Sequence, residues 1–241
     1  MKRQSFSAFP KEGLQFLRLL KRNNNREWFQ QHKGIYESHV KAPIYNLIET
    51  LGRDFQTFAP EFVASPKVSA YRIHRDTRFA KDKSPYKTHV AAVFPHAGLG
   101  KHEGAALYLH IAPSELFVGG GLYMPLPEDL QVLRNHIAEN PKGLQRIVEA
   151  PAFRRMFGSI EGDRLTRVPR GFPADHPAAE YLRYKQFLAS RSLEAEIVTS
   201  PRFYKVVVET FRGMLPFIRF LNEPIVTARR TRERQQALMK F

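Results

Sequence analysis

The spacing of apolar residues changes twice along the chain, and this change constrains the fold more than any other feature. In the first sixty residues apolar side chains recur at helical intervals, as Leu14, Leu17 and Leu20 do. From Lys67 the period is two, and Pro and Gly separate four strand-like segments. These segments are Val68–His74, Thr88–Phe94, Gly104–Ala112 and Glu115–Tyr123. Helical spacing returns beyond Pro125.

Consecutive strands with short links favour an antiparallel meander, and helices before and after the strands are typical of the α+β class. We therefore predict a small antiparallel β-sheet of about four strands, flanked by N-terminal and C-terminal helices. The triplet at residues 119–121, Gly-Gly-Gly, is expected to end the sheet. Later helical patterns lie at Ala178–Leu188, Pro201–Phe211 and Glu223–Phe241. With no internal repeat or clear linker, the chain is expected to form a single domain over residues 1–241.

The segment NNNREWF at residues 23–29 is expected to end one helix and to begin the next. Asn tolerates the left-handed conformation that ends helices and is among the best N-cap residues. A functional interpretation makes three of its side chains a polar support for a basic loop: Asn24, Arg26 and Glu27. A structural interpretation, in which the segment caps helices and buries Trp28 and Phe29, accounts for every residue and is favoured.

The composition favours polyanionic partners. Lys and Arg number 38 and Asp and Glu 23, so the formal net charge is +15, which suits nucleic acid, anionic membranes or phosphorylated metabolites. Cysteine is absent, which excludes disulfides, thiolate catalysis and Cys-based zinc or iron–sulfur sites. No apolar run approaches the roughly 20 residues of a membrane span. The N-terminal MKRQSFSAFPKEG lacks the apolar run of a signal peptide, so we expect a cytoplasmic location.

The stretch RIHRDTRFAKDKSPYK at Arg72–Lys87 concentrates positive charge in one connection between expected strands. Its six cationic and two anionic side chains leave a local charge of +4. Such crowding costs folding energy unless acids elsewhere in the fold or an anionic ligand offset it. Long ordered loops tend to be functional, and Arg and Lys both bind phosphate or carboxylate. The pattern therefore predicts an anion site made of seven side chains: Arg72, Arg75, Arg78, Lys81, Lys83, Tyr86 and Lys87.

A structural alternative uses the same charges. The arginines and Lys81 can pair with the loop acids Asp76 and Asp82, or with a remote acid such as Glu27. In either case we expect the loop to be ordered and docked against the NNNREWF helix, with Glu27 or Asp76 engaging an arginine. Burial of Phe79, Pro85 and Tyr86, at roughly 1.5–3 kcal/mol for each large side chain, outweighs the screened repulsion.

Three motifs together carry a family resemblance. NNNREWF, the Arg72–Lys87 stretch and GGGLYMP at Gly119–Pro125 resemble a widespread, mainly bacterial family of conserved hypothetical proteins, a domain of unknown function. The resemblance covers essentially the whole chain and implies no activity, substrate or cofactor. Family members commonly look like RIYRDTRFSKDKSPYK. Here His74 and Ala80 replace the Tyr and the Ser, which disfavours an essential hydroxyl at those two positions.

Other candidate sites are weaker. The nine histidines show no HExxH or comparable spacing, so we expect no metal and no cofactor. Ser84 is a nucleophile candidate, but a Ser before Pro85 is more often a turn residue. The arginines of Ala228–Arg234 can follow a phosphate backbone or form a solvated helix face.

Three functions follow from these observations. The leading hypothesis is an anion-binding module, with nucleic acid as ligand, because Phe79 and Tyr86 among cations suit backbone neutralisation and base stacking. The second is an enzyme that holds a phosphorylated or carboxylated small molecule with an arginine clamp and moves a proton with Asp76, Asp82 or Glu27. The third is a structural or protein-interaction domain in which the arginines only bridge the N-terminal helices to the sheet.

Overall fold

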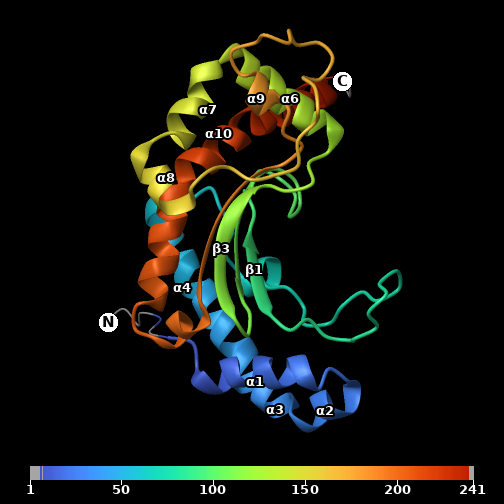
Figure 1. Ribbon diagram of the computed structural model, residues 1–241, viewed down its shortest axis with the longest axis vertical. Helices are drawn as coiled ribbons and strands as arrows, with labels where there is room; N and C mark the ends of the chain where they lie inside the picture. Colours follow the sequence, from blue (N-terminus) through green and yellow to red (C-terminus); the bar gives the residue numbers. More distant parts are fainter. Residues whose placement is uncertain (1–5, 7, 239–241) are drawn as a thin grey trace. The chain divides into compact units, whose positions relative to one another are not determined.

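A four-stranded antiparallel sheet with the order β1-β2-β3-β4 confirms the α+β class (Figure 1). The computed structural model describes residue 6 and residues 8–238. Its strands are β1 Val90–Phe94, β2 Ala106–Ile111, β3 Glu115–Leu122 and β4 Phe187–Glu194. The helices before the sheet are α1 Lys11–Arg22, α2 Arg26–Gln31, α3 Lys33–Tyr36, a π-helical turn at Glu37–Lys41, α4 Ala42–Phe58 and α5 Pro66–Ser69. The later helices are α6 Pro127–Glu139, α7 Pro141–Val148, α8 Pro151–Phe157, α9 Ala179–Leu182, a 3-10 helix at Ala195–Thr199 and α10 Phe203–Leu238.

Two strands differ from those expected. Val68–His74 is not a strand, because Pro66 begins the short helix α5 and the chain then makes only isolated bridges. The fourth strand is β4 instead, in a region where the sequence predicted a helix over Ala178–Leu188. The polar residues of β4 hide the alternation that marks a strand. The buried side chains, Phe187 and Ala189, lie at its start, and its later half is partly exposed. The glycine triplet does not end the sheet as expected, because β3 runs through it to Leu122 and β4 follows later in the chain.

The C-terminal helix α10 is continuous where two helices were expected. It runs through Pro216 and Pro224, although each Pro removes one backbone donor. Phe217, Ile218 and Leu221 are fully buried beside these prolines. Their burial outweighs the missing hydrogen bonds. Residues 239–241 of the predicted helix lie outside the described residues.

The chain forms two compact units, each built from separated segments. The first comprises Met1–Phe94, Tyr108–Val118 and Arg191–Thr210, and the second comprises Pro95–Leu107, Gly119–Ser190 and Phe211–Phe241. In the first unit α4 packs on β1, where the Phe55 and Phe94 rings meet edge to face at 5.4 Å. Gly13 lets α1 approach the carbonyl of His39 more closely than any Cβ would permit. The single-domain organisation stays a prediction.

In the second unit an asparagine of α10 holds the residue that precedes β2. The backbone N–H of Ala105 donates to Asn222 Oδ1 at 2.7 Å, and Asn222 Nδ2 donates to the Ala105 carbonyl at 2.8 Å. Asn222 is 3% exposed and Ala105 is fully buried. The amide therefore satisfies a donor and an acceptor that water cannot reach.

Replacement of this amide tests its contribution. Asn222→Ala leaves both Ala105 groups buried without a partner, so we expect the free energy of unfolding to fall by about 2–4 kcal/mol. Gln235→Ala, an exposed amide on the same helix, is the matched control. Urea unfolding of the two variants measures the difference, and equal values would contradict a role for the Asn222 bonds.

Candidate functional site

Residues 72–87 fold into an antiparallel ribbon that projects away from the sheet (Figure 1, teal). His74 and Tyr86 form a bridge, the Lys87 N–H donates to the Ile73 carbonyl at 2.7 Å, and the Arg75 N–H donates to the Pro85 carbonyl at 2.9 Å. Residues 76–84 form the tip. We call residues 72–87 the basic ribbon. Its backbone pairing gives the cations defined positions.

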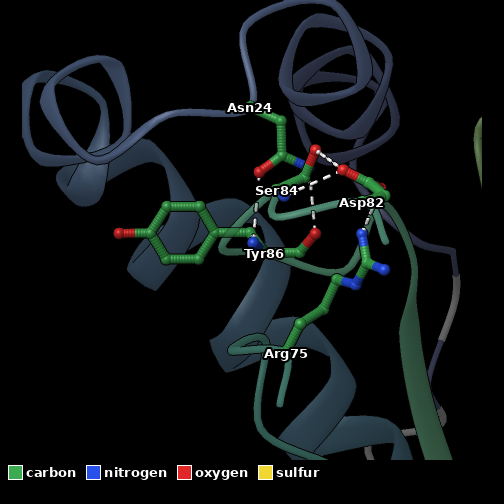
Figure 2. A network of polar contacts seen from close by, with 5 residues as sticks. All are labelled: Asn24, Arg75, Asp82, Ser84 and Tyr86. Atoms are coloured by element: carbon green, nitrogen blue, oxygen red, sulfur yellow. Dashed lines mark hydrogen bonds and ion pairs between the residues drawn. The ribbon is translucent and has the colours of Figure 1, made fainter. Parts of the chain in front are cut away.

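One side chain anchors the basic ribbon to the turn between α1 and α2. Asn24 Nδ2 donates to the Tyr86 carbonyl at 2.9 Å, and the Tyr86 N–H donates to Asn24 Oδ1 at 3.1 Å (Figure 2). The Tyr86 ring is 3% exposed and stacks on Phe29 with a centroid distance of 4.0 Å. The expected docking is therefore confirmed, with Asn24 and Tyr86 as the contact.

The rest of the NNNREWF segment follows the structural interpretation in part, because Phe29 is buried as expected whereas Trp28 is only partly buried. Asn25 caps α2, because its side chain accepts from the Trp28 N–H at 2.9 Å. Arg26 and Glu27 are exposed, and among the described residues neither side chain has a hydrogen-bond or ion-pair partner. The expected pairing of a ribbon arginine is therefore made by Asp76 and not by Glu27.

The two acids of the basic ribbon are used within it. Arg75 pairs with Asp82 at 2.5 Å, and Arg78 pairs with Asp76 at 2.7 Å. Asp82 also accepts from the Ser84 hydroxyl at 2.6 Å (Figure 2). Hydrogen bonds from Ser84 and Arg75 hold the pKa of Asp82 far below its usual range, and the bond from Arg78 lowers the pKa of Asp76. Both carboxylates therefore stay ionised at neutral pH.

The remaining cations carry the net charge of the basic ribbon. Arg72 and Lys81 are exposed and have no carboxylate partner among the described residues. The Lys83 ammonium donates to the Thr77 carbonyl at 3.0 Å, and the Lys87 ammonium lies 5.1 Å from the centre of the Tyr71 ring. The bond from Lys83 to a neutral carbonyl does not neutralise its charge, so Arg72, Lys81 and Lys83 keep the ribbon positively charged.

The expected burial of Phe79 is wrong. Its ring is 95% exposed at the tip of the basic ribbon, with the Arg78 guanidinium 5.8 Å from the ring centre. The local ion pair between Asp76 and Arg78 shapes the turn beside it, and the ring points away from the core as a result. Of the expected apolar anchors, only Tyr86 is fully buried.

Beside the ribbon, the sheet carries a cluster of partly exposed rings that the sequence analysis missed. We call it the aromatic face: Tyr71, His89, Tyr108, His110 and Phe117. The His110 and Phe117 rings are parallel within 4° at a centroid distance of 5.0 Å, and the His89 and His110 centroids are 5.1 Å apart. The alternation of β2 is the signal that could have revealed it, because buried Leu107, Leu109 and Ile111 leave Tyr108 and His110 on the opposite side.

The imidazoles of the aromatic face are neutral at pH 7. Burial lowers the pKa of His89 to about 4, helped by repulsion from His110 and Lys87. Burial also lowers the pKa of His110, although the hydrogen bond to Glu115 opposes this. Among the described residues, no group of three or more His, Asp or Glu side chains is arranged to hold a metal ion.

The anchor can be tested by its removal. Asn24→Ala leaves two backbone groups of Tyr86 without partners, so we expect the free energy of unfolding to fall by about 1–3 kcal/mol. Hydrogen exchange of residues 72–87 should accelerate at the same time. Glu27→Ala, a neighbouring exposed change, should shift stability by less than about 0.5 kcal/mol. Unchanged exchange in Asn24→Ala would mean that other contacts hold the basic ribbon.

The lowered pKa of His89 predicts a pH dependence of stability. The His89 imidazole takes up a proton near pH 6.5 in the unfolded chain but only near pH 4 in the folded chain. The contribution of neutral His89 to the free energy of unfolding is therefore complete above pH 6.5 and is lost as the pH falls toward 4. It amounts to at most about 3 kcal/mol, reduced by partial solvent access. Thermal melts of His89→Gln should therefore lose less stability between neutral pH and about pH 5 than the wild type does. His74→Gln, at an exposed site, is the control, and identical pH profiles for His89→Gln and wild type would contradict the assignment.

Comparison with known proteins identifies the family and no activity. No curated protein matches the chain. No described helix has the length and apolar character needed to span a membrane. The family model described as "Conserved hypothetical protein (DUF2461)" matches residues 12–220. The chain therefore belongs to this family of conserved hypothetical proteins, as its motifs predict.

Proposed function

We propose that the protein binds nucleic acid, with the basic ribbon in contact with the phosphate backbone. The main support for this proposal is that the basic ribbon is anchored at its base and exposes cations that no carboxylate neutralises. Asn24 and Tyr86 hold its base, while Arg72 and Lys81 remain without a carboxylate partner among the described residues. Fixed cations bind a polyanion with little loss of side-chain and loop entropy.

The charge of the whole chain supports the same ligand. A net charge of +15 attracts polyanions over long distances and accelerates their association. At the tip, the exposed Phe79 offers a ring surface beside Arg78. An aromatic ring among cations suits a ligand that carries both phosphates and bases. The cytoplasmic location predicted from the sequence is compatible with such a ligand.

The contacts give less support to the two alternatives. An enzyme that uses Asp76 or Asp82 for proton transfer needs a carboxylate that titrates near neutral pH, but their hydrogen bonds hold both acids ionised. The structural alternative requires Arg75 and Arg78 to bridge the N-terminal helices to the sheet. Both pair inside the ribbon instead, and Asn24 makes the connection.

Removal of two exposed ribbon cations tests the proposal. In the double variant Lys81→Ala/Lys83→Ala we expect affinity for short DNA and RNA strands to fall about 10–30-fold at about 0.1 M salt. The slope of log affinity against log salt should decrease by about 2, because two phosphate contacts are lost. Fluorescence anisotropy over a salt series measures both quantities.

The matched control removes the same charge elsewhere. Lys142→Ala/Lys185→Ala deletes two exposed lysines outside the basic ribbon, so affinity and salt slope should stay close to wild type. Equal losses in the two double variants would indicate attraction by net charge alone and would contradict a site at the ribbon. No binding of DNA or RNA by the wild type at low salt would overturn the proposal.

A further inference from the structure

We infer that the aromatic face is a stacking site for unpaired nucleobases, so the preferred ligand is a single-stranded nucleic acid. This inference rests on the proposed function and names its ligand class. It assigns the bases to Tyr108, His110 and Phe117 on the sheet and the phosphates to the adjacent basic ribbon. The five rings come from β2, β3 and the two chain segments that flank the ribbon.

The rings form one contiguous, partly exposed cluster, in which His110 and Phe117 stack on each other and the remaining neighbours are tilted. His110 on β2 and Phe117 on β3 have parallel rings, and Tyr108 meets Phe117 at 6.0 Å in an edge-to-face contact. Tyr71 lies 6.4 Å from Tyr108 and extends the row toward the ribbon. Each ring is partly exposed, whereas the aliphatic side chains of β2 are buried on the other side. Rings held in position by a sheet bind bases without further ordering.

The distribution of charge on this surface suits a ligand that has anionic phosphates and uncharged bases. His89 and His110 are neutral at pH 7 because burial lowers the pKa of both, so the aromatic face itself carries little positive charge. Glu115, which faces His110, is the nearby carboxylate, and Ser192 donates to it at 3.0 Å. Positive charge begins at the border, where Lys87 lies over Tyr71. In the proposed complex, bases therefore contact the rings of the aromatic face and phosphates contact the cations of the basic ribbon.

The form of the nucleic acid follows from access to the bases. In a duplex the base faces are stacked inside the helix and cannot lie against a sheet. In a single strand each base presents a free face, and one base on an aromatic side chain contributes about 1–3 kcal/mol. Stacking tolerates every base because each base has a ring face, so we expect low sequence specificity.

An abasic strand separates stacking from charge attraction. We compare a short single-stranded DNA, an abasic strand of the same length and charge, and the corresponding duplex by fluorescence anisotropy. The wild type should bind the base-containing strand at least about fivefold more tightly than the abasic strand, as one stacked base predicts. It should also prefer the single strand to the duplex.

Substitutions of Phe117 test whether the preference for base-containing strands arises at the aromatic face. Phe117→Leu should bind both single strands with nearly equal affinity and with the salt slope of the wild type, whereas Phe117→Trp should retain the preference for bases. Tyr123→Leu removes an exposed ring outside the aromatic face and should change neither quantity. Thermal melts verify folding, and Phe117→Trp keeps the test valid if Phe117→Leu is unstable.

The outcomes distinguish this inference from the proposed function. Equal affinity of the wild type for base-containing and abasic strands would overturn the stacking site and leave the backbone contact standing. A preference for the duplex, or an unchanged base preference in folded Phe117→Leu, would also overturn it. Absence of binding to every strand at low salt would overturn both proposals.

Discussion

The basic ribbon depends on a two-bond contact between one amide side chain and one backbone residue. Asn24 supplies an acceptor and a donor to Tyr86 in the same way that a neighbouring strand would, and Asn222 does the same for Ala105. A primary amide suits this task because its oxygen and nitrogen match the spacing of a backbone C=O and N–H. Without it, packing of Tyr86 on Phe29 would bury polar groups without partners. The anchor therefore makes the stacking of Tyr86 favourable.

Once anchored, the basic ribbon limits its own repulsion. Asp76 pairs with Arg78, two residues further on, and Asp82 pairs with Arg75 across the ribbon, and both pairs stabilise the tip. These pairs are exposed, so each contributes little to global stability, and salt weakens them further. Their main effect is local, because they fix the turn and leave Arg72 and Lys81 exposed. The charged side chains of the basic ribbon therefore have defined positions. A free loop with a charge of +4 would instead be extended and mobile.

Local rules explain which features the sequence could predict. Asn25 capping, the α+β class and the docking of the ribbon follow from neighbouring residues and hydrophobic period. The sequence did not predict β4 as a strand, because its pairing partner β3 lies far away in sequence and the exposed half of β4 is polar. The continuity of α10 through Pro216 depends on tertiary burial, which overrides propensity. Likewise Phe79 is exposed because a charged turn, not its own hydrophobicity, sets its direction.

His74 connects the family motif to the anchor. Its imidazole ring lies 5.3 Å from the Tyr86 ring and 6.5 Å from the Phe29 ring and is tilted against both. The imidazole therefore packs with its ring against the anchored Tyr86, and this contact involves no hydroxyl of residue 74. The same argument applies to the aromatic face, where neutral His110 lies parallel to Phe117 and serves as a ring. At the aromatic face the imidazole acts through its planar surface, and burial lowers the pKa of His110, which favours this neutral form.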